Sequence, residues 1–327
     1  MRENLIAFDS IDSENVFEQH ALNLFAYQFE NNKVYRSYCD LINVSPAEVH
    51  HFSEIPFLPI QFFKTHKVTS NPSETAVTFL SSKTTGQIAS KHPVHDIDLY
   101  VKSFEKGFAH FYGAIEEYVL LALLPSYLER EGSSLVFMAD HLIKKTNRPE
   151  SGFYLNDWEA LRKQLEKGEQ QKQKTLLLGV SFALLEGAEK YEWNLKNTLI
   201  METGGMKGMR KEWIRSELHQ KLKEAYGVTQ VHSEYGMTEL LSQAYSTGEG
   251  LFRCPPWMKV LSRSLEDPFE LMEQGKTGAL NIIDLANVDS CAFIATEDLG
   301  KVHSGGSFEV LGRFDHAEIR GCNLMVL

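Results

Sequence analysis

Basic residues are scarce in this sequence relative to acidic ones. Its 327 residues carry 33 lysines and arginines against 44 acidic side chains, which gives a formal net charge of −11 at pH 7. Nucleic acids and anionic membranes are bound by a positive field that such a balance does not provide. We therefore expect neither nucleic acid nor an anionic membrane as a stable partner. An enzyme that uses ATP would have to concentrate its positive charge at the ATP-binding site.

Long apolar runs are also missing. The longest, Tyr118 to Pro125 (YVLLALLP), is far shorter than the roughly 20 residues that a membrane-spanning helix requires. We interpret it as a buried helix and expect no membrane span. The N-terminal stretch MRENLIAFDSIDSENVFEQH has acidic residues where an export signal needs a basic start and a continuous apolar run, so no export signal is predicted.

Cysteine is rare and unpaired in its spacing. The four cysteines are Cys39, Cys254, Cys291 and Cys322, and no two of them form a C-x-x-C motif. This spacing indicates neither a structural zinc site nor a disulfide framework. A reducing, cytoplasmic location is the expectation.

What the sequence does contain is material for a large core, because 43% of its residues are hydrophobic. Short apolar runs between polar turns predict the buried strands of a layered α/β protein. We predict strands at residues 75–80, 133–139, 175–182, 199–202, 280–285 and 291–295. Helical spacing predicts helices over 13–31, over 96–124 and up to Tyr226. The charged segment 157–174 predicts a solvated helix and loop, and is the best candidate for a mobile flap.

One stretch, His232 to Glu239 (HSEYGMTE), combines the groups that a nucleotide pocket needs. It follows a short apolar run, so that the end of a strand opens into a turn. Tyr235 offers a ring to stack, Gly236 a backbone without Cβ, Thr238 a hydroxyl and Glu239 a hard oxygen ligand.

Two further segments offer contacts to phosphate. SSKTTG, residues 81–86, follows a predicted strand and presents hydroxyls together with backbone N–H groups. Gly204 and Gly205 stand between a strand and a helix. A backbone without Cβ can approach a ligand closely there, and the helix N-terminus favours an anion.

These segments resemble the motifs of the adenylate-forming superfamily, which includes acyl-CoA synthetases, adenylation domains and luciferases. The loop 81–86 and the core 235–239 are followed, in the superfamily's order, by TEDLG at 296–300 and GRFDHAEIRG at 312–321. Within the superfamily, the chain is most similar to the acyl-protein synthetases of the bacterial luminescence fatty-acid reductase type. That likeness rests on the block DLANVDSCAFIATEDLG and the terminal RGCNLMVL. Phenylacetate-CoA ligases are the next nearest.

The resemblance implies a fold and a division of the chain. We expect an α/β protein with layered sheets, flanking helices and a smaller β-rich lobe. This is the large N-terminal domain of adenylate-forming enzymes without their small C-terminal domain. Residues 1–327 would form this single domain, with the layered part at about 1–250 and the β-rich lobe and hinge-like tail at 251–327.

The resemblance also implies roles for individual residues toward ATP and Mg²⁺. Gly204 and Gly205 would wall the adenine, whose face Tyr235 would meet. Asp298 would accept both ribose hydroxyls, and Arg313 would contact ribose or phosphate. Thr238 would contact the α-phosphate, and Glu239 would bind Mg²⁺. The other phosphate contacts would come from the loop residues Ser81, Ser82, Lys83, Thr84, Thr85 and Gly86.

The expected activity is ATP-dependent activation of a carboxylic acid, fatty or aryl, to an acyl-adenylate. In the acyl-protein synthetases a cysteine near the C-terminus takes the acyl group as a thioester and delivers it to a protein acceptor, a reductase or carrier. Cys322 matches that position, and a free cysteine in a tail strand is the alternative. An acyl- or aryl-CoA ligase is a second hypothesis. A catalytically silent nucleotide- or acyl-binding subunit is a third, since the family has glycine where Lys83 stands.

Overall fold

The computed structural model describes residues 6–82, 88–125, 132–204 and 213–314. Several candidate residues lie outside the described residues, and what the sequence predicts for them stays a prediction. These residues are Lys83, Thr84, Thr85, Gly86, Gly205 and Cys322.

The described residues form one 12-stranded sheet and a separate two-stranded hairpin. One half of the large sheet is parallel. Its strands, in spatial order, are β8 (Val231–Tyr235), β7 (Thr198–Thr203), β6 (Thr175–Val180), β4 (Val119–Leu123) and β5 (Gly152–Phe153). β4 and β6 are buried along their whole length, as expected of parallel strands covered on both faces.

The other half of the sheet is antiparallel and begins where β9 pairs with β8. Its strands, in spatial order, are β9 (Ala244–Ser246), β10 (Leu251–Arg253), β14 (Phe308–Arg313), β13 (Phe293–Val302), β12 (Thr277–Asp284) and β11 (Met258–Arg263). β1 (Leu58–Pro59) adds to β13 in parallel, and the hairpin joins β2 (Val77–Leu80) to β3 (Lys91–Val94). β8 is therefore the strand at which the sheet changes from parallel to antiparallel.

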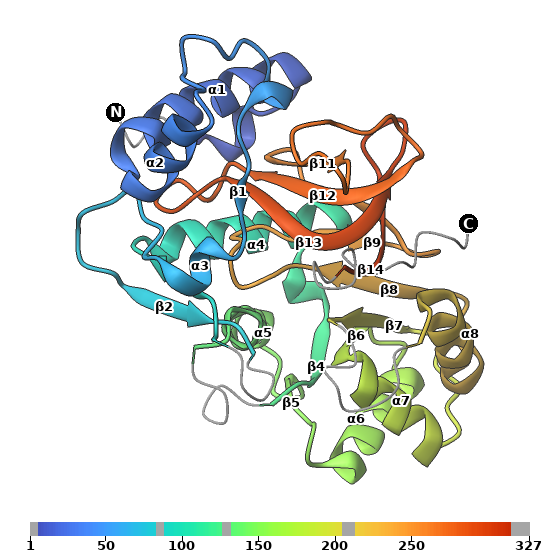
Figure 1. Cartoon of the computed structure of the whole chain (residues 1–327). Coiled ribbons are helices and arrows are strands. Elements are labelled where there is room, and N and C mark those ends of the chain that lie inside the picture. The colour runs from blue at the N-terminus through green and yellow to red at the C-terminus, as the bar shows by residue number, and fades with distance from the viewer. Residues whose placement is uncertain (1–5, 83–87, 126–131, 205–212, 315–327) are drawn as a thin grey trace.

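Helices flank both halves, with α1 and α2 beside the antiparallel strands and α5 to α8 beside the parallel ones (Figure 1). The helices are α1 (Glu14–Asn31), α2 (Lys33–Leu41), α3 (Phe62–Thr65), α4 (Ile97–Tyr112), α5 (Ser134–Thr146), α6 (Trp158–Gln170), α7 (Ser181–Lys190) and α8 (Arg215–Tyr226). α1 is anchored by Gln28, whose Nε2 donates to the carbonyls of Asn287 (2.8 Å) and Val288 (3.0 Å). Because Gln28 is fully buried, these bonds fix the helix against the turn that follows β12.

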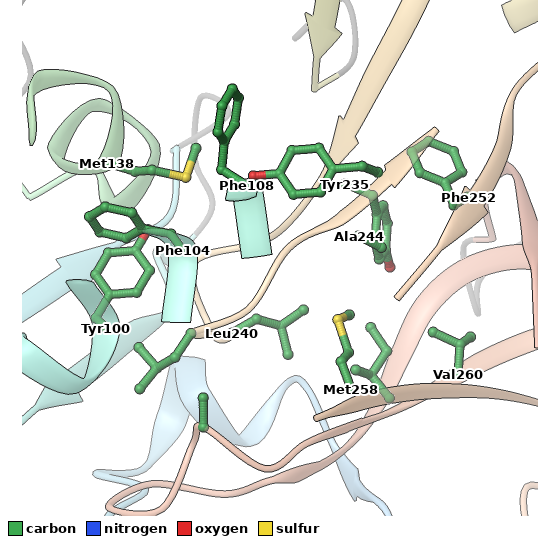
Figure 2. Packing of buried hydrophobic residues seen from close by; sticks show 14 of the residues in the cluster. Tyr100, Phe104, Phe108, Met138, Tyr235, Leu240, Ala244, Phe252, Met258 and Val260 are labelled. Carbon is green, nitrogen blue, oxygen red and sulfur yellow. The ribbon is translucent and has the colours of Figure 1, made fainter. Parts of the chain in front are cut away.

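One hydrophobic core joins the two halves of the sheet. Figure 2 shows Phe104 and Phe108 of α4 in the same cluster as Tyr235 of β8 and Met258 of β11. The strand that carries the candidate tyrosine is thus packed against both the helical layer and the antiparallel strands.

The apolar run at residues 118–125 is a strand and not the helix that the sequence predicts. α4 ends at Tyr112, where Gly113 takes a φ of 80°, and β4 follows as a separate element. All five residues of β4 are buried. A strand covered on both faces shows no alternation of apolar and polar residues, so its pattern cannot be told from that of a buried helix.

The segment 133–139 shows the opposite error, since the predicted strand is the first half of α5. Ser133 is the N-cap, and its side chain accepts a hydrogen bond from the backbone N–H of Val136. Val136, Ala139 and Leu142 are buried at intervals of three residues, which is a helical spacing. The seven-residue window was too short to reveal that period.

The charged segment 157–174 contains α6, as the sequence predicts. The helix buries Leu161, Leu165 and Gly168 on one face. Glu169 near its end accepts hydrogen bonds from the backbone N–H groups of Lys196 (2.9 Å) and Asn197 (2.9 Å). A helix anchored in this way does not match the prediction of a mobile flap.

Candidate active site

The candidate residues gather at the carboxyl ends of β7 and β8. Gly204 follows the last residue of β7, and Tyr235 is the last residue of β8. The two strands pair in parallel with Thr203 opposite Glu234, so their ends lie at the same edge of the sheet. Open α/β sheets bind their ligands at this edge, where the strand order changes direction.

Asp298 is the central polar group of the site. Its Oδ2 accepts a hydrogen bond from the hydroxyl of Tyr235 (2.7 Å), and its Oδ1 accepts one from Nε of Arg313 (3.1 Å). Asp298 lies within β13, opposite Arg313 on β14, and only 6% of it is exposed. The structure brings together three residues that lie far apart in the chain.

The carboxylate of Asp298 keeps capacity for a ligand. Each carboxylate oxygen has two lone pairs, so both can accept a further hydrogen bond besides those from Tyr235 and Arg313. Asp298 raises the pKa of the Arg313 guanidinium, which stays charged. The Arg313 side chain is 77% exposed, so its remaining donors are accessible to a ligand.

Tyr235 holds Asp298 from a fixed position. Its ring packs edge-on against Phe252 (5.9 Å between centroids) and Phe308 (5.6 Å), which stack on each other. Tyr235 and Phe252 lie side by side in Figure 2. Burial raises the pKa of Tyr235 well above its usual value, and the neighbouring Asp298 adds to this effect. The hydroxyl therefore remains a donor, while the contact with adenine remains a prediction.

Gly236 lies close to the carboxylate of Glu234. A Cβ at this position would come within 2.5 Å of Oε1 of Glu234. Glu234 in turn accepts a hydrogen bond from the hydroxyl of Thr203 on β7. A larger residue at Gly236 would therefore require the Glu234 carboxylate to shift.

Glu239 is almost entirely buried, with 4% exposed. Burial raises the pKa of its carboxyl group, and a hydrogen bond with Ser90 and the charges of Arg313 and Lys64 oppose that rise only in part. Ser90 also donates its backbone N–H to Oγ of Ser81 (2.9 Å). The start of the loop 81–86 is thus tied to the residue that contacts Glu239. Ser82, next in that loop, is exposed.

The turn that carries Thr238 and Glu239 is held by residues that the sequence analysis missed. Nδ1 of His92 lies 2.7 Å from the carbonyl oxygen of Thr238, and Nε2 of the same ring lies 3.1 Å from Oδ1 of Asn287. Asn287 donates from Nδ2 to the carbonyl of Glu239 (2.7 Å). Burial lowers the pKa of His92 to about 4.

Asp284 holds the residues that follow Glu239. It accepts hydrogen bonds from the backbone N–H groups of Leu241 (2.7 Å) and Ser242 (3.0 Å) and from the Ser242 hydroxyl (2.5 Å). Asp284 is the last residue of the buried strand β12, and Asn287 follows it in the block DLAN. Polar residues at such a strand end were the available signal for both.

A further buried carboxylate, Glu202, stands near Gly204 at the end of β7. It accepts from Nε of Arg215 (3.1 Å), and Nε2 of His219 lies 3.6 Å away. Burial alone would raise the pKa of Glu202, but the hydrogen bond from His219 and the charge of Arg215 outweigh it and hold this pKa below its usual value. Arg215 also donates to the carbonyl of Val310 on β14 (2.9 Å). The sequence pointed to the glycine pair here and not to these charged residues.

The donor atoms near Glu239 suit Mg²⁺ better than a tightly caged metal. In the part of the chain that the structure describes, no three His, Cys, Asp or Glu side chains converge as a metal site. Mg²⁺ is commonly held by one or two carboxylates together with phosphate oxygens of a substrate. A single buried glutamate with a serine hydroxyl beside it fits that pattern.

The described helices include none with the length and apolar character needed to cross a bilayer.

Comparison with known proteins identifies similar chains. The profile of the family described as "Acyl-protein synthetase, LuxE" matches residues 4–99 and 176–327. A long-chain-fatty-acid–luciferin-component ligase of Aliivibrio fischeri is 23% identical over 325 residues, covering 92% of this chain and 85% of the relative.

Solved structures share the fold. A 2-hydroxyisobutyryl-CoA ligase in complex with 2-HIB-AMP and CoA matches with a TM-score of 0.64 and 12% identity, over 97% of this chain and 81% of the ligase. ATP-bound MatB from Rhodopseudomonas palustris matches with a TM-score of 0.56 and 16% identity. That match covers 74% of this chain and 49% of MatB, so the chain spans about half the length of MatB.

Two of the buried glutamates, Glu239 and Glu202, predict opposite effects of pH on stability. The pKa of Glu239 is raised in the folded protein, so the free energy of unfolding falls as pH rises from about 4.5 through that pKa. Glu239→Gln should therefore be more stable than the unmodified protein at pH 7, by a margin that shrinks toward pH 4. Urea denaturation at pH 4, 5.5 and 7 measures this.

Glu202→Gln is the matched control, because Glu202 is equally buried but has a lowered pKa. Its carboxylate stabilises the fold above the unfolded pKa, and this stabilisation disappears as pH falls through the folded pKa. The substitution should cost about 1.5–3 kcal/mol at pH 7 and less at low pH, since it removes a charge-assisted hydrogen bond. Equal changes in the two variants at pH 7 would contradict this assignment.

Proposed function

Because the chain belongs to the acyl-protein synthetase family, LuxE, we propose that it activates a carboxylic acid with ATP and passes the acyl group to a protein thiol. The observation that carries the proposal is the buried contact of Asp298 with Tyr235 and Arg313 at the carboxyl end of β8. It supplies acceptors and a cation at the edge of the sheet where nucleotides bind in such folds.

The first step overcomes the inertness of a free carboxylate. One carboxylate oxygen attacks the α-phosphorus of ATP and forms an acyl-adenylate, and the bond to the β-phosphate oxygen breaks to release pyrophosphate. AMP is then a good leaving group on the acyl carbon, which oxide is not. Such a reaction asks the protein to position reactants and stabilise charge more than to form bonds itself.

The chain's own residues would divide that task. Asp298 would accept hydrogen bonds from the ribose hydroxyls, and Arg313 would donate to ribose or phosphate from its exposed face. The loop 81–86, with Gly204, Gly205 and Thr238, would line the adenine and phosphates. Tyr235 would keep the Asp298 carboxylate in one orientation through its hydroxyl.

Glu239 would hold Mg²⁺ together with phosphate oxygens. The ion would neutralise the charge that builds up on the phosphates. A buried glutamate is a suitable partner, because a cation beside it would favour the ionised form that burial opposes.

The second step would transfer the acyl group from AMP to the thiolate of Cys322. A thioester forms, the bond between acyl carbon and phosphate oxygen breaks, and AMP leaves. His316 and Arg320 stand near Cys322 in the sequence and would favour the thiolate if the fold brings them close. The name of the Aliivibrio fischeri relative supports a long-chain fatty acid as the substrate class and a luciferin component as the destination in that organism. A protein acceptor of comparable role is proposed for this chain.

Asp298→Asn should impair acid-dependent ATP–pyrophosphate exchange by weakening nucleotide binding. Losing hydrogen bonds to a charged acceptor costs about 1.5–3 kcal/mol, so the KM for ATP should rise by about 10- to 100-fold. The control is Glu297→Gln, because the neighbouring Glu297 bonds Gln61 (2.6 Å) and not the site. Its KM for ATP should be unchanged.

The same assay decides among the enzyme hypotheses. Absence of exchange with every aliphatic and aromatic acid tested, despite nucleotide binding, would favour a silent subunit. AMP release that requires coenzyme A would favour a CoA ligase.

The thioester step predicts a covalent adduct that intact-mass spectrometry detects. With ATP, Mg²⁺ and a fatty acid, the protein should gain the mass of the acid less one water, and Cys322→Ala should gain nothing. Cys254→Ala is the control, because burial raises the pKa of the Cys254 thiol and keeps it unreactive. An adduct that persists in Cys322→Ala would rule out this cysteine as the acceptor.

A further inference from the structure

The strand that carries Asp298 departs from regular pairing at that residue. Between β12 and β13 the register runs from Ala279 opposite Leu299 to Asn281 opposite Ala295. Two steps along β12 are matched by four along β13, so β13 bulges where residues 296–298 lie. β-Bulges commonly re-aim a side chain beside an active site, and here the bulge presents Asp298 to Tyr235 and Arg313.

A bulge loses regular ladder hydrogen bonds, and Thr296 replaces some of them. Its hydroxyl donates to the carbonyl of Leu280 on β12 (2.8 Å) and accepts from the backbone N–H of Asp298 (3.1 Å). Both Thr296 and Asp298 are buried, so each unpaired backbone group here would carry a desolvation cost.

Arg263, which lies two strands away on β11, donates further hydrogen bonds to the backbone around the bulge. It ends β11 opposite Ala279 and reaches across β12 to β13. Its Nη1 donates to the carbonyl of Leu280 (3.0 Å) and to Oδ1 of Asn281 (2.7 Å), and its Nη2 donates to the carbonyl of Thr296 (2.6 Å). Neighbouring strands lie about 4.8 Å apart, so only a long side chain can make these contacts together.

Burying the Arg263 guanidinium is unfavourable, which indicates that this side chain has a role beyond packing. Arg263 is only 6% exposed, and among the described residues no carboxylate forms an ion pair with it. Burying a guanidinium against carbonyl dipoles alone is unfavourable compared with an apolar side chain. Burial lowers the pKa of Arg263 to about 10, so it still carries its charge at pH 7. The planar fork of donors is the property that an apolar residue or a lysine does not offer.

We propose that Arg263 is a positioning residue that fixes the bulge of β13 and thereby the carboxylate of Asp298 in the nucleotide site. The predicted effect on the KM for ATP rests on the proposed function. The hydrogen bonds by which Arg263 stabilises the bulge belong to the fold and do not depend on it. The proposal assigns to β11 a role in the site, although no residue of β11 touches Tyr235, Asp298 or Arg313 through a recorded hydrogen bond among the described residues.

Arg263→Lys tests this, because lysine keeps the charge and length but has a single nitrogen. The KM for ATP in pyrophosphate exchange should rise about tenfold, while kcat at saturating ATP stays within about twofold. Val260→Ala is the control, since Val260 is a buried residue of the same strand, opposite Ile282 and away from the bulge. It should lower the melting temperature and leave the KM for ATP unchanged. An equal rise of KM in both variants would show a merely structural role and overturn the proposal.

Amide hydrogen exchange without nucleotide separates this proposal from the proposed function. Exchange at residues 296–299 should be at least tenfold faster in Arg263→Lys than in the unmodified protein, and unchanged in Val260→Ala. This measurement tests the role of Arg263 even if no acid supports pyrophosphate exchange. If Arg263→Lys does not fold, Asn281→Ala removes one acceptor of the same guanidinium and should give a smaller change in the same direction. Unchanged exchange at 296–299 in the folded variant overturns the proposal.

Discussion

The site depends on keeping one carboxylate, that of Asp298, inside a β-sheet. A buried charge is tolerated only when it is paired and hydrogen-bonded. The Asp298 carboxylate accepts from the Tyr235 hydroxyl and the Arg313 guanidinium, and the backbone N–H of Asp298 donates to the Thr296 hydroxyl. The two contacts to the carboxylate come from β8 and β14, while Asp298 itself lies on β13, so the carboxylate joins β8, where the sheet changes from parallel to antiparallel, to the antiparallel half.

The turn from Tyr235 to Ser242 is stabilised on the same principle. It carries the groups proposed to meet phosphate and Mg²⁺, and its backbone is held by Asp284, the last residue of β12, and by Asn287 just beyond it. Burial raises the pKa of both Asp284 and Glu239, so the protein accepts an electrostatic cost at each. At Asp284 the buried carboxylate holds the turn through its hydrogen bonds to the backbone. At Glu239 a bound cation would offset the unfavourable burial of the charge.

The sequence predicted the convergence of distant motifs better than it predicted local structure. The order of the motifs along the chain indicates a fold shared with the adenylate-forming superfamily, and in that fold Tyr235, Asp298 and Arg313 come together. In contrast, the run at 118–125 was assigned to a helix, because a strand buried on both faces has no alternating pattern. Arg263, Asp284 and Asn287 were missed for another reason. The end of β12 marked Asp284 and Asn287 only as polar residues. No spacing within one segment shows which backbone groups these two residues and Arg263 reach.

The central claim is that Tyr235, Asp298 and Arg313 form the sugar side of a mononucleotide site. A crystal structure with a non-hydrolysable acyl-adenylate analogue tests it most directly. The account predicts both ribose hydroxyls within hydrogen-bonding distance of the Asp298 carboxylate, with the contact to Tyr235 retained. An analogue bound elsewhere, with Asp298 still in contact only with Tyr235 and Arg313, would contradict it.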